Sequence, residues 1–369
     1  MDRRFVSLDS PTSRKNPVGY HACQGTYVAA SGVAPRTAFI ATHYNVDFSE
    51  HYLGHFMAER GYGFLGWNTR FRGAEPYFLL EHALIDIGAG VRWLREEAGV
   101  EDVVILGNSG GGSLMGAYQS QALAPSIRPA RGLPLPDAVN ELLPADYYVS
   151  LNSHKGRPEV LTDWFDPAVI DEWDPTSVDP KLDMYDERNG PPYSPEFVER
   201  YRAAQVARNH RITEWAITEL ERLAEKGVPD RLFNLYRTWA DLRLMDGSLD
   251  PSDRSVGVCY AGDPKRANYS PFGIGSCNTL RTWLSMWSLR ESDCCGAPHL
   301  AKITQPSLVV QSLADTGCFP SDARAIYDSL GASDKRLELV PGDHYLEAPE
   351  GARDAVADLI AGWLSDQGA

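Results

Sequence analysis

Residues 102–112 read Asp-Val-Val-Ile-Leu-Gly-Asn-Ser-Gly-Gly-Gly. The apolar, β-branched first half is typical of a buried strand, and it leads into a Gly-x-Ser-x-Gly turn from Gly107 to Gly111. Residues 113–122 follow with helical spacing and no proline. A strand that turns sharply into a helix crowds the residue at the turn, so its neighbours must be small. The order of strand, turn and helix therefore predicts an exposed, reactive serine at Ser109.

The alternative is a tight turn or a phosphate-binding glycine loop with an incidental serine. A P-loop needs Lys followed by Ser or Thr, and a dinucleotide-binding loop needs Gly-x-Gly-x-x-Gly spacing. Residues 107–113 have neither pattern. We therefore favour a nucleophile, which requires an imidazole to take its proton and a carboxylate to orient that imidazole.

Two downstream segments supply these partners. Residues 306–312 have the pattern of a buried strand and lead into a loop that carries Asp315. A predicted helix at 321–330 and a predicted strand at 335–340 come next, and His344 lies on the loop after that strand. The sequence thus predicts the triad Ser109, Asp315 and His344, in this chain order.

Three other carboxylates are alternatives for the acid of the triad. Asp343 is expected to form the turn, because adjacent side chains rarely meet in the geometry that a histidine and its acid need. Asp163 and Asp166 follow a predicted strand at 145–151 and are the better rivals. We favour Asp315 over both.

The order of the triad and the placement of its members resemble the α/β-hydrolase superfamily. The resemblance implies an α/β fold, with a mostly parallel central sheet and helices on both faces. Residues 37–125 and 300–365 resemble the two halves of the catalytic domain. Residues 37–43 resemble the strand that ends at the oxyanion loop, and residues 61–73 resemble the next strand and its turn.

The predicted oxyanion hole differs from the family pattern at one point. Family members often have His-Gly after the first of these strands, whereas here His43 is followed by Tyr44 and Asn45. Backbone N–H groups bind the oxyanion, so a side-chain change does not remove the donor. The second expected donor is either Tyr44 or Asn45. Gly110, next to the nucleophile, is the first expected donor.

Residues 156–295 have no counterpart in that core. Prolines punctuate the beginning of this segment, and apolar residues then recur at helical spacing. These helical patterns cover residues 195–226, 231–245 and 278–289. Capped α/β hydrolases carry a lid between the sixth and seventh strands, so the resemblance implies a helical cap at 156–295. The catalytic domain would then comprise residues 1–155 and 296–369.

Several residues are expected to contact a substrate. His154 follows the strand at 145–151, and ligands of open α/β sheets bind at the carboxyl ends of strands; His43 ends another predicted strand. Trp164 and Trp173 lie in the proline-rich part of the cap and are expected to face the substrate. Tyr260 and Tyr269 are further loop aromatics that could do so, whereas the aromatic residues at helical spacing are expected to form the core of the lid.

Composition excludes several classes of function. The chain has 35 Lys and Arg against 50 Asp and Glu, a net charge of −15, which argues against nucleic-acid binding and against anionic membranes. No apolar run has the length of a membrane helix, and the first residues lack the apolar core of a signal peptide, so we expect a cytoplasmic protein. The expected partner is a small-molecule substrate. The sequence is compatible with a homodimer as well as with a monomer.

No metal or cofactor is expected. The six cysteines include no Cys-x-x-Cys pair, which favours reduced thiols. His51 and His55 are four residues apart on a predicted helix, but the His-Glu-x-x-His order of a zinc protease is missing. We therefore expect surface or packing roles for both histidines.

These observations predict a serine hydrolase that cleaves an ester or lactone through an acyl-enzyme on Ser109. A large aromatic cap and no evident basic subsite predict a medium-sized, partly apolar carboxylic substrate. Within the same fold, a carbon–carbon bond hydrolase of a ring-cleavage product and an acyltransferase are alternatives. Outside it, a ligand-binding module on a hydrolase scaffold is disfavoured by the complete triad.

Overall fold

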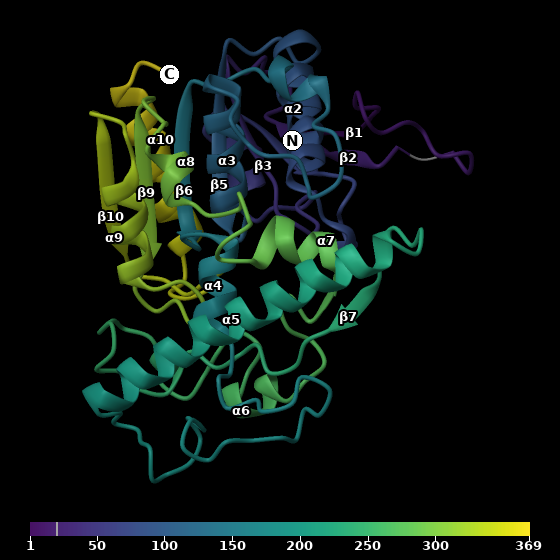
Figure 1. Ribbon diagram of the computed structural model, residues 1–369. Helices are drawn as coiled ribbons and strands as arrows, with labels where there is room; N and C mark the ends of the chain where they lie inside the picture. Colours follow the sequence, from purple (N-terminus) through teal and green to yellow (C-terminus); the bar gives the residue numbers. More distant parts are fainter. Residues whose placement is uncertain (20) are drawn as a thin grey trace.

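An eight-stranded sheet forms the centre of the computed structural model, which describes residues 1–19 and 21–369 (Figure 1). The strands are β1 (Asp2–Leu8), β2 (Cys23–Ala29), β3 (Thr37–Ala41), β4 (Gly63–Asn68), β5 (Asp102–Ser109), β6 (Tyr147–Ser153), β9 (Ser307–Ser312) and β10 (Lys335–Val340). Their order across the sheet is β1-β2-β4-β3-β5-β6-β9-β10. Only β2 runs antiparallel to its neighbours β1 and β4. The predicted fold class, a mostly parallel sheet with helices on both faces, is confirmed.

Helices cover both faces of this sheet. One face packs against α2 (Leu80–Glu96), α3 (Gly111–Leu123), α8 (Ala297–Leu300) and α9 (Pro320–Ser329), and the other against α1 (Leu53–Glu59) and α10 (Ala352–Asp366). The position of β5 explains why residues 103–106 are all apolar: Val103 and Ile105 belong to the first core, whereas Val104 and Leu106 belong to the second. Both faces of the strand are buried, so neither can be polar.

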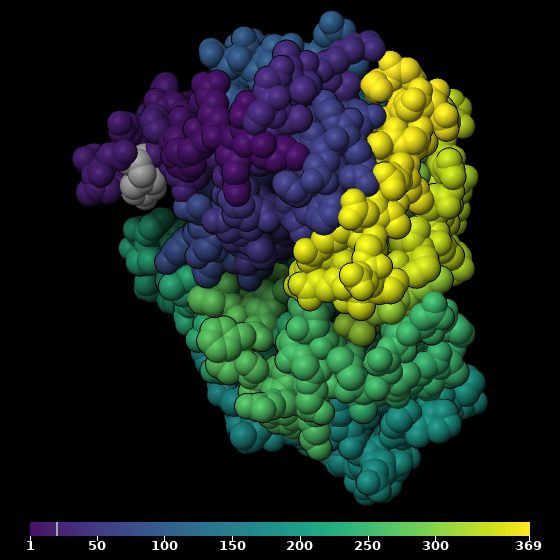
Figure 2. All heavy atoms as spheres, turned by 180° about the vertical axis from the view of Figure 1, so that it is seen from behind, coloured from purple at the N-terminus to yellow at the C-terminus, as the bar shows by residue number. Residues whose placement is uncertain are grey.

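The chain from residue 156 to residue 295, which follows β6, gathers at one end of the sheet, beyond the carboxyl ends of the parallel strands (Figure 1). Its elements are α4 (Arg157–Trp164), α5 (Pro195–Ala224), β7 (Leu232–Asn234), a 3-10 turn (Leu242–Leu244), α6 (Pro264–Asn268), β8 (Cys277–Thr279), α7 (Leu280–Thr282) and a π-helical turn (Trp283–Trp287). From behind, this segment lies against both the N-terminal and the C-terminal parts of the sheet domain (Figure 2). We call residues 156–295 the cap.

Two sequence-based predictions of helix are wrong. Residues 231–245 contain the short strand β7, paired with β8, and the 3-10 turn. Arg237 has a φ of 60°, a left-handed conformation that cannot continue a helix. The helix predicted around His51 starts only at Leu53, so His51 and His55 do not share it. Two further 3-10 helices, Glu75–Tyr77 and Asp137–Glu141, lie in connections of the sheet domain.

Within the described residues, no helix combines the length and the apolar character that crossing a membrane would require.

Candidate active site

Ser109 is the last residue of β5 and has a φ of 54°, which is costly for any residue other than glycine. The glycines around it leave room for a very sharp turn. A Cβ on Gly107 would lie 2.7 Å from the Cα of Gly112, and a Cβ on Gly111 would lie 2.2 Å from the carbonyl oxygen of Thr42. Larger residues would clash with backbone at both positions. The strand-turn-helix geometry predicted from the sequence is therefore present.

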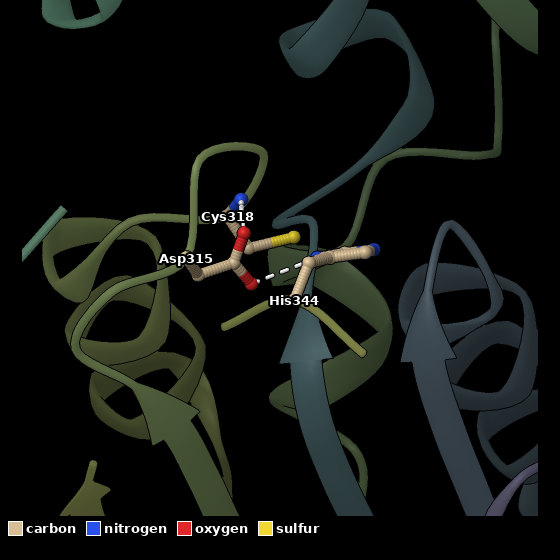
Figure 3. Close-up of side chains that lie close together, drawn as sticks. All are labelled: Asp315, Cys318 and His344. Carbon is tan, nitrogen blue, oxygen red and sulfur yellow. Dashed lines mark hydrogen bonds and ion pairs between the residues drawn. The ribbon is translucent and has the colours of Figure 1, made fainter. Parts of the chain in front are cut away.

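Ser109, His344 and Asp315 form one hydrogen-bonded chain. Nε2 of His344 lies 3.2 Å from Oγ of Ser109, and Nδ1 lies 2.8 Å from Oδ2 of Asp315. Figure 3 shows the second of these contacts, with Cys318 beside it. Oδ1 of Asp315 accepts from the backbone N–H groups of Gly317 and Cys318 at 2.7 and 3.0 Å. Because the carboxylate only accepts, Nδ1 donates, and Nε2 is left to accept the serine proton.

The imidazole of His344 is buried, and two opposing effects act on its pKa. Burial alone would lower the pKa, because it disfavours the charged ring. The charge of Asp315, its hydrogen bond and the nearby Asp343 outweigh burial and raise the pKa of His344 above its usual value near 6.5. The ring is therefore a stronger base than a free imidazole.

The rival carboxylates are engaged elsewhere. Asp163 pairs with Lys155 at 2.8 Å, and Asp166 forms a fully buried ion pair with Arg237 at 2.5 Å, within the cap. Asp343 accepts hydrogen bonds from three backbone N–H groups of the turn that follows it, as expected of a turn former. Of these carboxylates, only Asp315 is hydrogen-bonded to His344.

The three candidate oxyanion donors differ in their hydrogen bonding. The N–H of Asn45 points to Nδ1 of His43 at 3.4 Å, a long contact. The N–H groups of Gly110 and Tyr44 donate to no acceptor among the described residues. Gly110 and Tyr44 are therefore the better pair of donors, and Asn45 is the weaker candidate.

His154 and His43 are both buried near the triad. Nδ1 of His154 lies 3.5 Å from Sγ of Cys318, whose backbone N–H binds Asp315. Burial, and then the charge of Arg157, hold the pKa values of His154 and His43 well below the usual range, so both rings are neutral. Burial also raises the pKa of the Cys318 thiol, which is neutral as well.

The four cap aromatics singled out in the sequence fall into two groups. Trp164 is buried, with its ring edge-on to His154 and next to Tyr260, and Tyr260 contacts His344. Trp173, by contrast, is 69% exposed and lines a surface pocket of about 210 Å³ with residues of α5 and β7. Tyr269 lies under the guanidinium of Arg237. The expectation that Trp173 faces the substrate is therefore corrected: the structure does not bring it to the triad.

Asn152 is a residue that the sequence analysis missed. Its side chain donates to the carbonyl oxygen of His344 at 3.2 Å and to Oγ of Ser312 at 3.0 Å, and it accepts from the N–H of Ser312 at 2.7 Å. It thus ties the end of β6 to the end of β9 and to the histidine loop. Asparagine is a common turn residue at strand ends, so its presence at position 152 does not by itself indicate this bridging role.

Arg157, the first residue of α4, was also missed. A Cβ on Gly110 would lie 2.8 Å from Nη1 of Arg157 and 2.5 Å from Nε2 of His43. A buried cation therefore adjoins the nucleophile turn, which corrects the expectation of no basic group there.

One group of described side chains has the composition of a metal site: Asp315, Cys318 and His344 offer atoms within 4.8 Å of one another. The hydrogen bonds of Asp315 already engage both of its oxygens, and the thiol of Cys318 is protonated. A metal needs a deprotonated thiolate, so these residues fit a triad better than a metal centre.

No protein-family model matches the chain, and no curated protein matches its sequence. Solved structures do resemble it. The α/β hydrolase GrgF from Penicillium sp. sh18 is 13% identical, with 99% of each chain covered and a TM-score of 0.53. DcsB, solved with a substrate analogue, is 10% identical over 99% of each chain, with a TM-score of 0.53. Est1E from Butyrivibrio proteoclasticus is 11% identical over 98% of each chain, with a TM-score of 0.50. The chain thus has the α/β-hydrolase fold.

Proposed function

We propose that this chain, whose fold is that of the α/β hydrolases, is a serine hydrolase that cleaves carboxylic esters. The observation that carries the proposal is the unbroken contact from Oγ of Ser109 through His344 to Asp315, with the serine on a strained turn. A fold alone does not specify chemistry, but this arrangement of nucleophile, base and acid supports nucleophilic attack on a carbonyl group.

The chemistry follows from these contacts. Nε2 of His344 takes the hydroxyl proton as Oγ of Ser109 attacks the ester carbonyl, and Asp315 stabilises the imidazolium that forms. The N–H groups of Gly110 and Tyr44 bind the oxyanion, a contribution of about 3 to 4 kcal/mol per donor. His344 gives its proton to the departing alcohol. Water, deprotonated by the same ring, then releases the acid and restores Ser109.

The cap supplies the apolar part of the proposed substrate site. Tyr260 covers one face of His344, and Trp164 packs behind it against Trp239 with ring centroids 4.8 Å apart. Such a wall favours a medium-sized substrate with an apolar portion, because apolar surface that leaves water stabilises the bound state. We infer that the cap acts in choosing the substrate and that the triad carries out the reaction.

Covalent labelling tests the nucleophile directly. A fluorophosphonate probe should modify the wild-type protein at Ser109, as mapped by peptide mass spectrometry, and should not modify Ser109→Ala. That variant should stay folded and lose several orders of magnitude in ester turnover. Ser113→Ala, on the helix that follows the turn at Ser109, is the matched control and should be labelled normally. Labelling at another serine, or near-normal turnover by Ser109→Ala, would show that the assignment is wrong.

The same preparation separates ester hydrolysis from the alternatives. p-Nitrophenyl esters of graded acyl length, lactones and a vinylogous diketo acid are compared under one set of conditions, with and without an added alcohol acceptor. Turnover of the esters or lactones supports the proposal. Turnover restricted to the diketo acid would favour carbon–carbon bond cleavage, and products that appear only with the alcohol would favour acyl transfer.

A further inference from the structure

Arg157 is buried at the position where the cap leaves the sheet domain. It is the first residue of α4, four residues after β6 ends, and its side chain is 2% exposed. The guanidinium lies between two aromatic rings, 4.4 Å from the centroid of Tyr44 and 5.1 Å from that of Trp287. These contacts favour a cation and hold the plane of the group in place.

The guanidinium lacks the hydrogen bonds that a buried arginine needs. Nε and Nη2 are buried without an acceptor among the described residues. The nearest carboxylate oxygen, Oε1 of Glu75, is 3.9 Å from Nη2, too far for a hydrogen bond, and it is unpartnered as well. Burial raises the pKa of Glu75 despite the nearby Arg157, which weakens it as a counter-ion. A buried charge in this state is costly unless something else binds it.

The unsatisfied cation adjoins the catalytic serine. Nη1 of Arg157 lies 2.8 Å from the place that a Cβ on Gly110 would occupy, and Nε2 of His43 lies 2.5 Å from the same place. Nδ1 of His43 faces the N–H groups of Asn45 and Val46 at 3.4 and 3.3 Å, so Nδ1 accepts and Nε2 carries the proton. The two polar atoms nearest to this side of Gly110 are therefore donors, and Arg157 carries the charge between them.

We propose that Arg157 binds a carboxylate of the substrate, so that the preferred esters carry a second, ionised carboxyl group a few atoms from the scissile carbonyl. This inference rests on the proposed ester hydrolysis and names its substrate class. A carboxylate matches the paired donors of one guanidinium. A doubly charged phosphate would call for further cations, but His43 and His154 are neutral and the whole chain carries a charge of −15.

The test compares substrates that differ only in charge. Ethyl hydrogen glutarate carries the carboxylate, and ethyl glutaramate replaces it by a neutral amide of the same shape. The succinate and adipate half-esters vary the distance, and the butyryl ester of glycolate places the carboxylate in the alcohol portion. Acid release is followed by chromatography, and kcat/KM is the readout. The wild-type protein should prefer at least one carboxylate series over its neutral counterpart by about 30-fold or more, as expected when a charged partner is lost from a buried pair.

Three variants test whether the preference for carboxylate-bearing esters depends on Arg157. Arg157→Met should lower the ratio of carboxylate to amide kcat/KM to near one, and Arg157→Lys should keep part of the preference, because it keeps the charge but not the paired donors. Glu75→Gln leaves Arg157 in place and removes the nearest negative charge, so it should increase the preference. Arg222→Met, at the far end of α5 and paired with Glu219, is the control and should leave the ratio unchanged. Equal loss on charged and neutral esters in Arg157→Met would overturn the proposal, as would a wild-type protein without a preference.

A binding measurement keeps this test independent of turnover. Calorimetry on Ser109→Ala should show that glutarate binds, that glutaramide does not, and that adding Arg157→Met abolishes glutarate binding. If glutarate binds through Arg157 but no ester is hydrolysed, the proposed hydrolysis fails and the carboxylate site stands. If neutral esters are hydrolysed at Ser109 and glutarate does not bind, the carboxylate site fails and the proposed hydrolysis stands.

Discussion

The phenol ring of Tyr260 lies against the imidazole of His344, with ring centroids 5.4 Å apart and planes 12° apart. Tyr260 belongs to a tight turn of the cap that is closed by the pairing of Cys259 with Gly262. Gly317, next to the acid loop, leaves the necessary space, because a Cβ there would lie 2.6 Å from the Tyr260 ring. The cap therefore contacts the proposed catalytic base, and Tyr260 covers one face of His344.

Tyr260→Leu should lower kcat/KM for neutral esters by roughly 5- to 10-fold, because an aromatic pair is worth about 0.5 to 1.5 kcal/mol beyond simple burial. The loss of cover also relieves the burial that lowers the pKa of His344, so the acid limb of the pH profile should move to higher pH. Tyr260→Phe keeps the ring and should restore both quantities. Because Tyr260 acts through His344, an unchanged acid limb in Tyr260→Leu would contradict this positioning role.

Asp315→Asn should retain the fold and lose on the order of 10⁴ in turnover, because an amide can neither stabilise the imidazolium nor hold its tautomer. Asp163→Asn is the matched control: it breaks a contact between the cap and Lys155 and should have a far smaller effect on turnover. Asp166→Asn should reduce stability instead, since it leaves Arg237 buried without its carboxylate. Initial rates and thermal unfolding of the three variants, measured together, separate these effects. A large loss in Asp163→Asn with a stable fold would move the acid to α4.

The pH dependence of the wild-type protein should show a single acid limb, set by protonation of His344. The base must be neutral to accept the Ser109 proton, so activity falls as the pH drops through its pKa. Asp315 raises that pKa, so the midpoint of the limb should lie above pH 6.5. In Asp315→Asn the raising charge is gone and burial remains, so the midpoint of the residual activity should shift to lower pH. Profiles of kcat/KM with a neutral ester from about pH 5 to 9 check both statements. An upward shift in the variant would show that Asp315 is not the group that raises the pKa.

The positions of Ser109, Asp315 and His344 at strand ends could be predicted from the sequence because the signals are local. Ser109 ends β5, and Asp315 and His344 lie on the loops after β9 and β10; these three strands have nearly the predicted boundaries. The central residues of β5 and β9 are apolar. A strand buried on both faces has to be apolar throughout, whatever its neighbours are. The edge strand β1 has exposed, charged residues and is paired with β2. Because that pairing is not a local signal, the sequence pattern of residues 2–8 does not indicate a strand.

Long-range contacts explain what the sequence analysis missed. Arg157, at the start of a helix and beside a proline, has the sequence pattern of a solvent-exposed arginine. Its burial depends on Tyr44, Glu75 and Trp287, which are remote in the chain. Residues 231–245 have apolar side chains at helical spacing, but pairing of β7 with β8 determines their conformation.

Trp164 and Trp173 have similar surroundings in the sequence but different ones in the structure. Trp164 is 2% exposed and packs against Trp239, Tyr260 and His154, next to the triad, whereas Trp173 lies on the outer surface. Trp164→Ala should change the relative rates among esters of graded acyl length by roughly 10-fold or more, about 1 to 3 kcal/mol of differential transition-state binding.

Trp173→Ala removes an indole of the same size from the same cap and should leave these relative rates alone. Trp164→Ala also opens a cavity and should cost about 3 to 5 kcal/mol of stability, so rates are compared at a temperature where unfolding curves show both variants to be folded. Small esters, which reach the aromatic wall least, should be affected least. If both variants slowed every ester by one common factor, or if Trp173→Ala alone changed acyl preference, the cap would not select the substrate through the wall that Trp164 supports.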